Sequence, residues 1–339
     1  MAYTDNMEKK LQIIFGDVTF GVKGEDFQYI FSYQTGGPES FYAAGREWLY
    51  RTPKPTFWRA LTDNDRGCKF QMRSGVWMSA DLFMACTDFK VSVDGQEIPK
   101  PLRPNNNKYG ALEYAEKAAI SFCYETITNP KTEVWVSYEV DGAGSIRVNA
   151  KYEGKQGLPQ LPVFGMRFIM PTKAEGFCYE GLSGETYPDR MAGGIKGVYE
   201  VQGLPVTPYL VPQDCGMHMD TEWVEVCRST SLDNSRSKKG AGNGSGKDAA
   251  NNGAGCMRVE ADTEKFAFSC LPYTAQELEN ASHQEELPPK RRTVLCIYGA
   301  VRGVGGIDSW GTDVEEAYHV DGETDKEVSF KIRFHFQEA

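Results

Sequence analysis

Alternation of apolar and polar residues with a period of two is the feature that most constrains the fold of this 339-residue chain. Successive side chains of a β-strand point to opposite faces, so a segment with this pattern has one apolar and one polar face. The pattern predicts half-buried antiparallel strands along the whole chain. It recurs in four separate stretches: Phe27, Tyr29, Phe31 and Tyr33; Val134, Val136, Tyr138 and Val140; Ile146, Val148, Ala150 and Tyr152; Phe330, Ile332, Phe334 and Phe336.

The rest of the chain is expected to consist mainly of turns. Its 17 prolines and 35 glycines interrupt the strand-like runs at short intervals, and only residues 76–83 and 274–282 have a short helical pattern. A (β/α)₈ barrel needs about 250 residues of alternating strand and helix, and this sequence does not alternate in that way. The prediction is an all-β chain, long enough for two domains or for one large sandwich or barrel.

One segment, at about residues 228–256, differs from the rest. It is rich in Gly, Ser, Asn and Lys and almost devoid of apolar residues, so it cannot bury enough surface to offset its ordering entropy. The runs on either side, residues 222–227 and 257–261, have the pattern of strands. We therefore predict a disordered insertion at the tip of a hairpin within one domain that spans residues 1–339; a linker between two domains is the alternative.

Charge and composition exclude several classes of partner. A net charge of -10 at pH 7 opposes the phosphate neutralisation on which nucleic-acid binding depends. No signal-peptide pattern and no run of 18 apolar residues is present, so we expect no membrane contact and a cytoplasmic location. The nine cysteines include no C-x-x-C pair, which favours reduced thiols. The four histidines are too scattered to predict a metal site.

Three motifs stand out against this background. The first is Thr-Asp-Asn-Asp-Arg-Gly at residues 62–67, within the block 56–67. The second is the block 181–190, which ends in Glu-Thr-Tyr-Pro-Asp-Arg and is followed by Thr-Pro-Tyr-Leu-Val-Pro-Gln at residues 207–213. The third is Gly-Gly-Ile-Asp-Ser-Trp-Gly at residues 305–311. Glycines on both sides of Trp310 predict a loop whose backbone closely approaches another surface.

In this order, the three motifs resemble the small-chain domain of family 2 β-galactosidases, and the resemblance runs from about residue 10 to the C-terminus. It implies a galactose mutarotase-like supersandwich, which is one large antiparallel β-sandwich. It further implies that a large partner subunit carries the catalytic barrel and that the pair hydrolyses terminal β-D-galactosides such as lactose. Catalytic carboxylates, Mg²⁺ and a monovalent cation (Na⁺ or K⁺) are then expected in the partner, and no cofactor or metal in this chain.

The resemblance assigns roles to single residues. Trp310 is expected to reach the partner's active site, where its indole would lie against the apolar C–H face of a sugar ring. A place among six core tryptophans is the alternative. Asp308 and Ser309 could hydrogen-bond the loop backbone and hold the indole at its angle.

The other polar residues of the motifs are expected at the interface with the partner. Asp63 and Asp65 on one strand face would lie roughly 7 Å apart and point the same way, which does not suit two carboxylates that flank a glycosidic bond. An Asx-rich turn closed by Gly67 is the better interpretation. A solvated loop is the alternative for the second motif. The possible interface residues are Asp63, Asp65, Arg66, Glu185, Tyr187, Asp189 and Arg190.

Two other functions remain open. A stand-alone sugar mutarotase would need a histidine opposite a carboxylate on a concave sheet, and His218, His283 and Glu185 are the residues that could provide them. A purely carbohydrate-binding or scaffold module is the second alternative. It predicts that loss of Trp310 changes binding but not the rate of a partner's chemistry.

Overall fold

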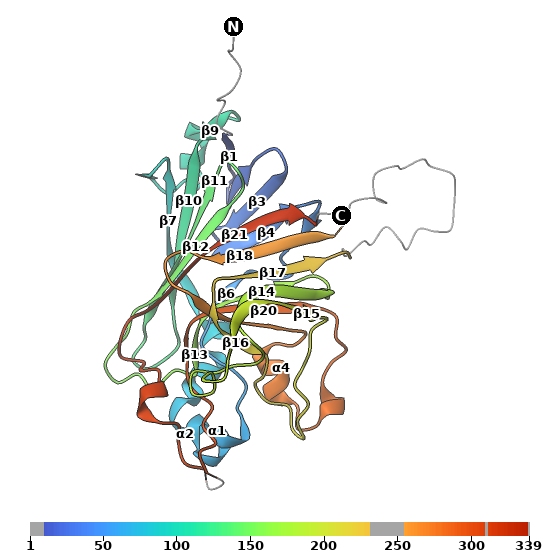
Figure 1. Ribbon diagram of the computed structural model, residues 1–339. Coiled ribbons are helices and arrows are strands. Elements are labelled where there is room, and N and C mark those ends of the chain that lie inside the picture. Colours follow the sequence, from blue (N-terminus) through green and yellow to red (C-terminus); the bar gives the residue numbers. More distant parts are fainter. Residues whose placement is uncertain (1–9, 231–253, 309–310, 338–339) are drawn as a thin grey trace.

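The computed structural model describes residues 10–230, 254–308 and 311–337, and it confirms the prediction of an all-β chain with large antiparallel sheets. The described residues form three antiparallel sheets of six, ten and five strands (Figure 1). None of the helices in these residues is long and apolar enough to cross a lipid bilayer.

The six-stranded sheet contains most of the N-terminal strands and has the order β5-β4-β3-β2-β1-β9. Its bounds are β1 Leu11–Phe15, β2 Thr19–Lys23, β3 Phe27–Ser32, β4 Gly37–Ala43, β5 Arg46–Glu47 and β9 Glu113–Ala115. The five-stranded sheet has the order β16-β19-β20-β13-β6. Its strands are β6 Lys54–Thr56, β13 Val163–Met170, β16 Met217–Thr221, β19 Phe266–Leu271 and β20 Thr293–Val301.

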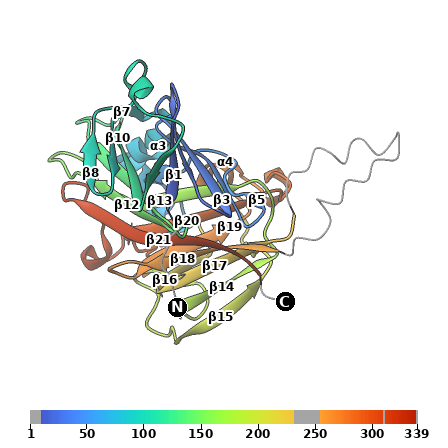
Figure 2. The ribbon, with the colours of Figure 1, turned by 90° about the horizontal axis from the view of Figure 1, so that it is seen from above.

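The ten-stranded sheet has the order β15-β14-β17-β18-β21-β12-β11-β10-β7-β8. Figure 1 shows that β21, β18, β17 and β14 run across the direction of β12, β11, β10 and β7, so the sheet is strongly twisted. Figure 2 shows β21, β18, β17, β14 and β15 side by side in this spatial order, with β15 at the edge of the sheet. Its bounds are β7 Ala85–Val93, β8 Gln96–Ile98, β10 Lys117–Glu125, β11 Glu133–Asp141, β12 Ile146–Tyr152, β14 Gly176–Leu182, β15 Lys196–Gln202, β17 Trp223–Arg228, β18 Gly255–Ala261 and β21 Lys326–Phe336.

The ten-stranded sheet packs against both of the other sheets. Tyr138 of the central strand β11 contacts Phe31 of the six-stranded sheet, with ring centroids 5.6 Å apart. Two strands along, Phe330 of β21 meets Phe168 of the five-stranded sheet edge to face at 6.0 Å. Edge-to-face and tilted aromatic pairs stabilise a core beyond the area that they bury. One continuous apolar core therefore joins the three sheets.

The period-two pattern predicts the buried face of most strands correctly. In β11 and β12 every predicted inward residue is buried. The prediction is wrong at the end of β21, where Phe336 is 46% exposed. There the strand continues past the packed part of the core and pairs only with Gly255 at the start of β18.

Helices are few and short in the described residues. The predicted helical stretch 76–83 is a 3₁₀ turn, Gly75–Ser79, followed by α3, Ala80–Phe83. The stretch 274–282 contains α4, Ala275–Asn280, which Thr274 caps by accepting a hydrogen bond from the Glu277 backbone N–H. Two more helices, α1 Asp63–Gly67 and α2 Phe70–Ser74, follow β6. Further 3₁₀ turns lie at Asn105–Lys108, Gln284–Glu286 and Glu316–Tyr318.

The segment predicted as an insertion lies between two paired strands. β17 and β18 form an antiparallel hairpin in which Arg228 pairs with Gly255, as predicted from their flanking pattern. The predicted limits, 228 and 256, are too wide because these residues belong to the strands. Residues 231–253, on which the prediction of disorder rests, lie outside the described residues.

The expectation of reduced thiols is wrong for one pair. Cys227 and Cys256 are joined by a disulfide across β17 and β18, and the other seven cysteines are free. The two cysteines are 29 residues apart in the chain, so only the strand pairing reveals their proximity.

Candidate functional site

The three sequence motifs meet at one end of the molecule, around α1 and α2 and far from β9 (Figure 1). The Asp189 carboxylate accepts hydrogen bonds from the backbone N–H of Val304 at 3.0 and 3.1 Å and from that of Gly305 at 2.7 Å. The Asn64 side chain donates to the Val304 carbonyl at 3.1 Å. Segments more than 100 residues apart in the chain thus form one polar cluster.

The first motif forms α1 because its side chains satisfy the free N–H groups at the start of a helix. The Thr62 hydroxyl accepts from the Asp65 backbone N–H at 3.2 Å, and the Asp65 carboxylate accepts from the Thr62 N–H at 3.0 Å. This reciprocal arrangement is a capping box, with Asp in the place where Glu or Gln is more common. The predicted Asx-rich turn is therefore wrong: the motif is a capped helical turn.

Asp65 is the centre of a buried charge cluster. Its carboxylate lies 2.6 Å from Arg59 Nη1 and 3.1 Å from Arg302 Nη1, and all three side chains are at most 1% exposed. Burial alone would raise the pKa of Asp65, but the two arginines and the capping hydrogen bonds lower it below its ordinary value. Asp65 is thus an internal, charged residue, and its predicted place at the interface is wrong.

The charge cluster supports the start of the third motif. Arg59 and Arg302 both donate to the Gly303 carbonyl, at 3.1 and 3.4 Å. Arg302 also pairs with Asp313, to which Arg73 of α2 donates at 2.6 Å. The loop that contains residues 309–310 is therefore held on both sides by buried or half-buried ion pairs.

Hydrogen bonds join the two sides of the loop. The Asp308 carboxylate accepts from the backbone N–H of Thr312 at 3.1 Å and from the Thr312 hydroxyl, so it joins the two sides of the loop as predicted. Arg190 donates to the Gly305 carbonyl. Ser309 and Trp310 lie outside the described residues, so the role of Asp308 in orienting Trp310 stays a prediction.

Gly67 and Gly311 bring the first and third motifs into backbone contact. A Cβ atom on Gly67 would lie 3.1 Å from the Gly311 Cα, and one on Gly311 would lie 2.6 Å from the Gly67 carbonyl carbon. Gly311 also has a φ of +86°, which L-residues with side chains rarely adopt. A glycine is thus required at residue 311 for both conformation and space.

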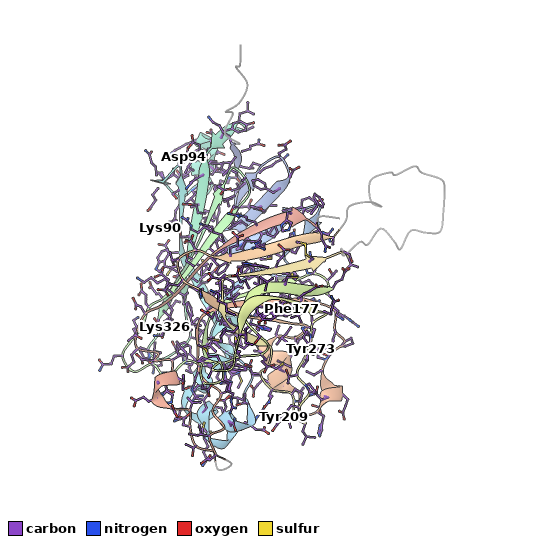
Figure 3. The ribbon with its side chains drawn as sticks, in the orientation of Figure 1. Lys90, Asp94, Phe177, Tyr209, Tyr273 and Lys326 are labelled. Atoms are coloured by element: carbon purple, nitrogen blue, oxygen red, sulfur yellow. A yellow bond between two sulfur atoms is a disulfide. The ribbon has the colours of Figure 1, made fainter. Side chains whose placement is uncertain are left out.

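A pocket of about 280 Å³ lies beside this loop. Figure 3 labels Tyr209 at this end of the molecule; its hydroxyl donates to Asp63 at 2.8 Å. All of the lining residues except Val304 have a side-chain carboxylate, amide, hydroxyl or guanidinium group, and such groups can form hydrogen bonds with sugar hydroxyls. The lining consists of Thr62, Asp63, Asn64, Glu185, Tyr187, Arg190, Tyr209, Gln213, Asp214 and Val304.

Two carboxylates in the pocket have different environments. Asp214 accepts a 2.8 Å hydrogen bond from the Tyr187 hydroxyl, and burial raises its pKa to about 7 despite the nearby Arg59. Glu185 is exposed and accepts from the Thr207 hydroxyl. Asp214 could therefore exchange a proton near neutral pH, whereas Glu185 accepts a hydrogen bond from Thr207 at the surface.

The other predicted interface residues divide into exposed and buried ones. Asp63 and Arg66 are 52% and 30% exposed and pair at 3.2 Å; Arg66 also lies 3.9 Å from Glu279. Arg190 is exposed and Asp189 is half-buried. Tyr187 is only 5% exposed but lines the pocket, so its place at the interface stays a prediction.

Sequence reasoning missed several residues of this site. Tyr209 and Gln213 lie in the block 207–213 that carries part of the family resemblance, and Asp214 follows it directly, so the block itself was the available signal. Arg59 lies in the block 56–67, so the resemblance was a signal for it as well. Arg302 gave no signal, because only the fold brings it to Asp65.

Three exposed apolar side chains belong to segments that adjoin the pocket-lining residues in the chain or pack on α1. Met72 on α2 is 79% exposed, Leu210 beside Tyr209 is 85% exposed, and Ile307 in the loop is 61% exposed.

The three residues that the sequence offers for a mutarotase site, His218, His283 and Glu185, are not paired with one another among the described residues. His218 is buried between aromatic rings, including Phe268 at 4.8 Å, and burial lowers its pKa to about 4. His283 is exposed and lies 3.1 Å from Glu286. In the described part of the chain, neither histidine has a hydrogen bond or ion pair with Glu185.

Comparison with known proteins agrees with the motifs. Residues 23–334 match the family described as "Beta galactosidase small chain". The chain belongs to this family. It is 57% identical to the β-galactosidase small subunit of Latilactobacillus sakei over 337 residues, which cover 97% of this chain and 99% of that protein.

This β-galactosidase small-chain protein is also similar to part of longer proteins. It is 32% identical over 332 residues to a β-galactosidase of Halalkalibacterium halodurans, which covers 96% of this chain but 28% of that protein. For the β-galactosidase BgaC of Bifidobacterium adolescentis the identity is 30%, covering 92% of this chain and 26% of that protein. The chain thus spans about a quarter of these longer relatives.

Solved structures with similarity to the chain are distant. One is the galactose 1-epimerase of Lactobacillus acidophilus NCFM, with a TM-score of 0.41 and 10% identity over 98% of this chain and 100% of that one. Another is a galactose mutarotase-like protein of Lactobacillus casei, with a TM-score of 0.40 and 8% identity over 94% and 100% of the two chains. Scores this low carry no argument about function.

Proposed function

We propose that this chain is the small, non-catalytic subunit of a two-chain β-galactosidase, which hydrolyses terminal β-D-galactose residues in β-D-galactosides such as lactose. The observation that carries the proposal is the coverage of the relatives. The chain matches a small subunit over nearly its whole length, but only about a quarter of the longer β-galactosidases. The remaining three quarters, with the catalytic barrel, would come from a large partner subunit.

In this proposal the reaction is a retaining hydrolysis that uses two carboxyl groups of the large subunit. One protonates the leaving oxygen while the other attacks the anomeric carbon, at a separation of about 5–5.5 Å. The acidic residues at the present site are poorly suited to these roles: Asp65 is enclosed by two arginines, and Asp63 is engaged by Tyr209 and Arg66. We place Mg²⁺ and a monovalent cation in the large subunit as well.

The small subunit would complete the sugar site. A pocket of about 280 Å³ is at or below the lower limit of ~300–1,000 Å³ for complete ligand sites, so we interpret it as one wall of a composite site. Trp310 would extend from the adjacent loop and place its indole against the galactosyl or glucosyl ring. Misplacing a substrate by about 1 Å can cost on the order of a hundredfold in rate, so this contact should affect turnover as well as affinity.

The surface around the pocket would receive the large subunit. Met72, Leu210 and Ile307 offer apolar contacts, and the exposed Asp63 and the half-buried Arg66 offer polar contacts. Protein interfaces commonly combine both kinds of contact. We place the complex in the cytoplasm, since seven of the nine cysteines are free, as is usual in a reducing compartment.

The two alternatives find less support. A stand-alone mutarotase would need a histidine facing a carboxylate, and among the described residues His218 and His283 are engaged elsewhere. A scaffold that only binds carbohydrate would not account for the near-complete match to a β-galactosidase small subunit. Assays of the separate and mixed chains test the mutarotase, and the turnover rate of a complex with Trp310→Ala tests the scaffold.

The test is hydrolysis of a chromogenic β-galactoside by three samples: the chain alone, a β-galactosidase large subunit alone, and the two mixed. We expect activity in the mixture only. If the mixture is no more active than the large subunit alone, the proposal is wrong. If the lone chain accelerates interconversion of galactose anomers, the mutarotase replaces it.

A further inference from the structure

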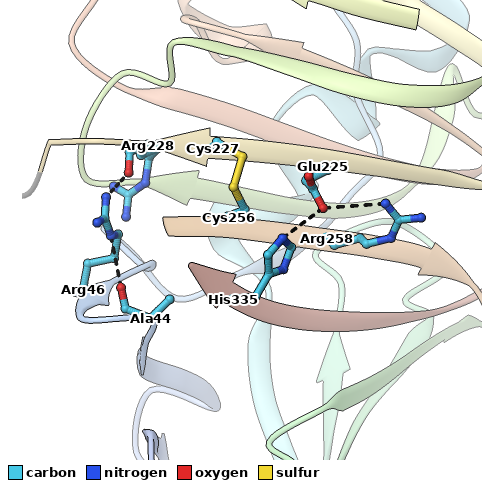
Figure 4. Close-up of a disulfide and its surroundings, with 8 residues drawn as sticks. All are labelled: Ala44, Arg46, Glu225, Cys227, Arg228, Cys256, Arg258 and His335. Carbon is cyan, nitrogen blue, oxygen red and sulfur yellow. Dashed lines mark hydrogen bonds and ion pairs between the residues drawn. A yellow bond between two sulfur atoms is a disulfide. The ribbon is translucent and has the colours of Figure 1, made fainter. Parts of the chain in front are cut away.

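Two cysteines and a histidine lie in one row across three neighbouring strands, far from the candidate sugar site. Cys227 of β17 is the register partner of Cys256 of β18, and Cys256 is the register partner of His335 of β21. Register partners point to the same face of a sheet, and Figure 4 shows the three side chains together. The two cysteine Cα atoms are 4.1 Å apart, the separation of a closely spaced antiparallel pair.

A carboxylate completes the group. Glu225 precedes Cys227 by two residues, so it points to the same face, and its Oε2 lies 3.4 Å from His335 Nε2. One ligand atom from each of Glu225, Cys256 and His335 falls within 4.8 Å of the others. Thiolate, imidazole and carboxylate are the three ligand types of protein zinc sites.

The sulfur atoms of Cys227 and Cys256 are bonded to each other, so this disulfide must be reduced before they can bind a metal as thiolates. We propose that reduction of the Cys227–Cys256 disulfide creates a zinc site formed by Cys227, Cys256, His335 and Glu225. A dithiol reductant supplies two electrons and two protons to the S–S bond, which yields two thiols and leaves the reductant as a disulfide. The thiols lose both protons when Zn²⁺ binds.

The geometry requires only small side-chain movements. Ligand atoms held about 2.0–2.3 Å from one tetrahedral zinc ion lie less than about 4 Å from one another, so the present spacing has to contract slightly. His335 is 42% exposed and can rotate without disturbing the core. The cysteines need no backbone movement to approach each other, because the strand pairing already places them side by side.

The positive charge of Arg258 does not block the site. Arg258 Nη1 lies 3.6 Å from the Glu225 carboxylate, but its Nε donates to Glu260 at the shorter distance of 2.8 Å. Its guanidinium also lies 3.8 Å from the centre of the Trp223 ring, where a cation–π interaction holds it. Glu225 can therefore turn to a metal while Arg258 keeps two other partners.

The location indicates what the site would do. Cys227 and Cys256 lie one pair from the end of the β17–β18 hairpin, next to Arg228 and Gly255. A disulfide in oxidising conditions, or a zinc ion in reducing conditions, would hold the two strands together at this end of the hairpin. The inference does not depend on the proposed galactosidase function.

Zinc binding to the tag-free full chain tests the proposal. We would titrate Zn²⁺ in competition with a chromophoric chelator, before and after reduction with a phosphine that is then removed. We expect about one equivalent of tightly bound Zn²⁺ in the reduced chain and less than a tenth of that in the oxidised chain. Co²⁺ should give a thiolate charge-transfer band in the reduced chain only.

Variants assign the ligands. Cys256→Ser and the exposed His335→Gln should each weaken zinc binding at least tenfold, whereas Cys178→Ser should leave it unchanged. Cys178 is the matched control, because it is a free cysteine on the same face, opposite Glu225. The proposal is overturned if the reduced wild-type chain binds no more zinc than the oxidised chain, or if His335→Gln binds zinc like the wild type. Neither outcome depends on whether Cys256→Ser folds.

Discussion

The core between the sheets and the polar end around α1 are stabilised in different ways. In the core, buried aromatic and aliphatic side chains such as Phe31, Tyr138, Phe168 and Phe330 contact several neighbours each. At the polar end, the structure depends on a few contacts: the Asp65 carboxylate forms ion pairs with two arginines, and the backbone of Gly311 contacts that of Gly67. The hydrophobic contribution of the core is spread over many contacts, whereas the polar end depends on a few irreplaceable groups.

This difference predicts how the two regions respond to mutation. A conservative change in the core removes only a small part of the total hydrophobic and dispersion contribution to stability. A conservative change in the charge cluster leaves a buried charge without its partner, which is costly. It should also displace the loop on which the proposed function depends.

The largest effect on stability is expected for Asp65→Asn. It leaves Arg59 and Arg302, both almost fully buried, without their shared carboxylate, and should lower the free energy of unfolding by about 3–5 kcal/mol. Urea unfolding monitored by circular dichroism measures this. Asp63→Asn is the matched control; its side chain is 52% exposed, and we expect a change of less than about 0.5 kcal/mol. Equal effects of the two variants would contradict the account of the charge cluster.

Asp214→Asn should change how stability depends on pH. The pKa of Asp214 is raised to about 7, so between the pKa of the unfolded chain, about 4, and pH 7 the folded state binds a proton that the unfolded state releases. The stability contribution of this proton is full at low pH and is lost as pH rises to 7.

The free energy of unfolding at pH 5 and pH 8 measures this effect. Between pH 5 and pH 8 the free energy of unfolding of the wild type should fall by on the order of 2 kcal/mol more than that of Asp214→Asn. This value is smaller than the one obtained from about 1.4 kcal/mol per pKa unit, because the side chain is partly exposed to solvent. Parallel pH profiles of the two proteins would show that Asp214 is not the group that titrates.

Gly311→Ala tests the backbone contact between the first and third motifs. The positive φ should cost about 1–2 kcal/mol, and the 2.6 Å approach of the new Cβ to Gly67 should displace the loop. Gly184→Ala is the control, because Gly184 has a φ of +71° with no atom within 4 Å of an added Cβ. Activity with the large subunit should fall for Gly311→Ala and persist for Gly184→Ala; loss of activity in both would remove the special role of the contact.

The smallest effect is expected in the core. Ile297→Val removes one methyl group from a fully buried side chain and should cost about 0.5–1.5 kcal/mol. Activity in the reconstituted complex should be unchanged. A loss of activity comparable to that of Gly311→Ala would mean that the two regions are not as independent as proposed.

The sequence predicts the parts of this fold that depend on local periodicity. The buried faces of β11 and β12 follow from the alternation of residues such as Val136 and Val148, and α4 lies within the short helical pattern predicted at residues 274–282. The exposed Phe336 was mispredicted, because alternation does not reveal where a strand runs past its packing partners.

The polar site could be predicted only in part. The motifs identify Asp63, Asp189 and the loop after Gly303, but not that Arg302 meets Asp65, 237 residues away. The same limit applies to Cys227, Cys256 and His335, which look scattered in the sequence and are brought together by strand register alone. Long-range pairing depends on the whole fold, so no local pattern specifies it.

The most direct test of the central claim is the effect of Trp310→Ala on a complex with a β-galactosidase large subunit. Trp135→Ala is the matched control, since Trp135 lies half-exposed on β11, where Lys90 covers its ring. Calorimetric titration should confirm that both variants still bind the large subunit, and kcat and KM for a β-galactoside are then measured separately. We predict that Trp310→Ala lowers kcat/KM on the order of a hundredfold, with part of the loss in kcat, while Trp135→Ala has no effect. Full activity of a bound Trp310→Ala complex would contradict the claim that this chain completes the sugar site.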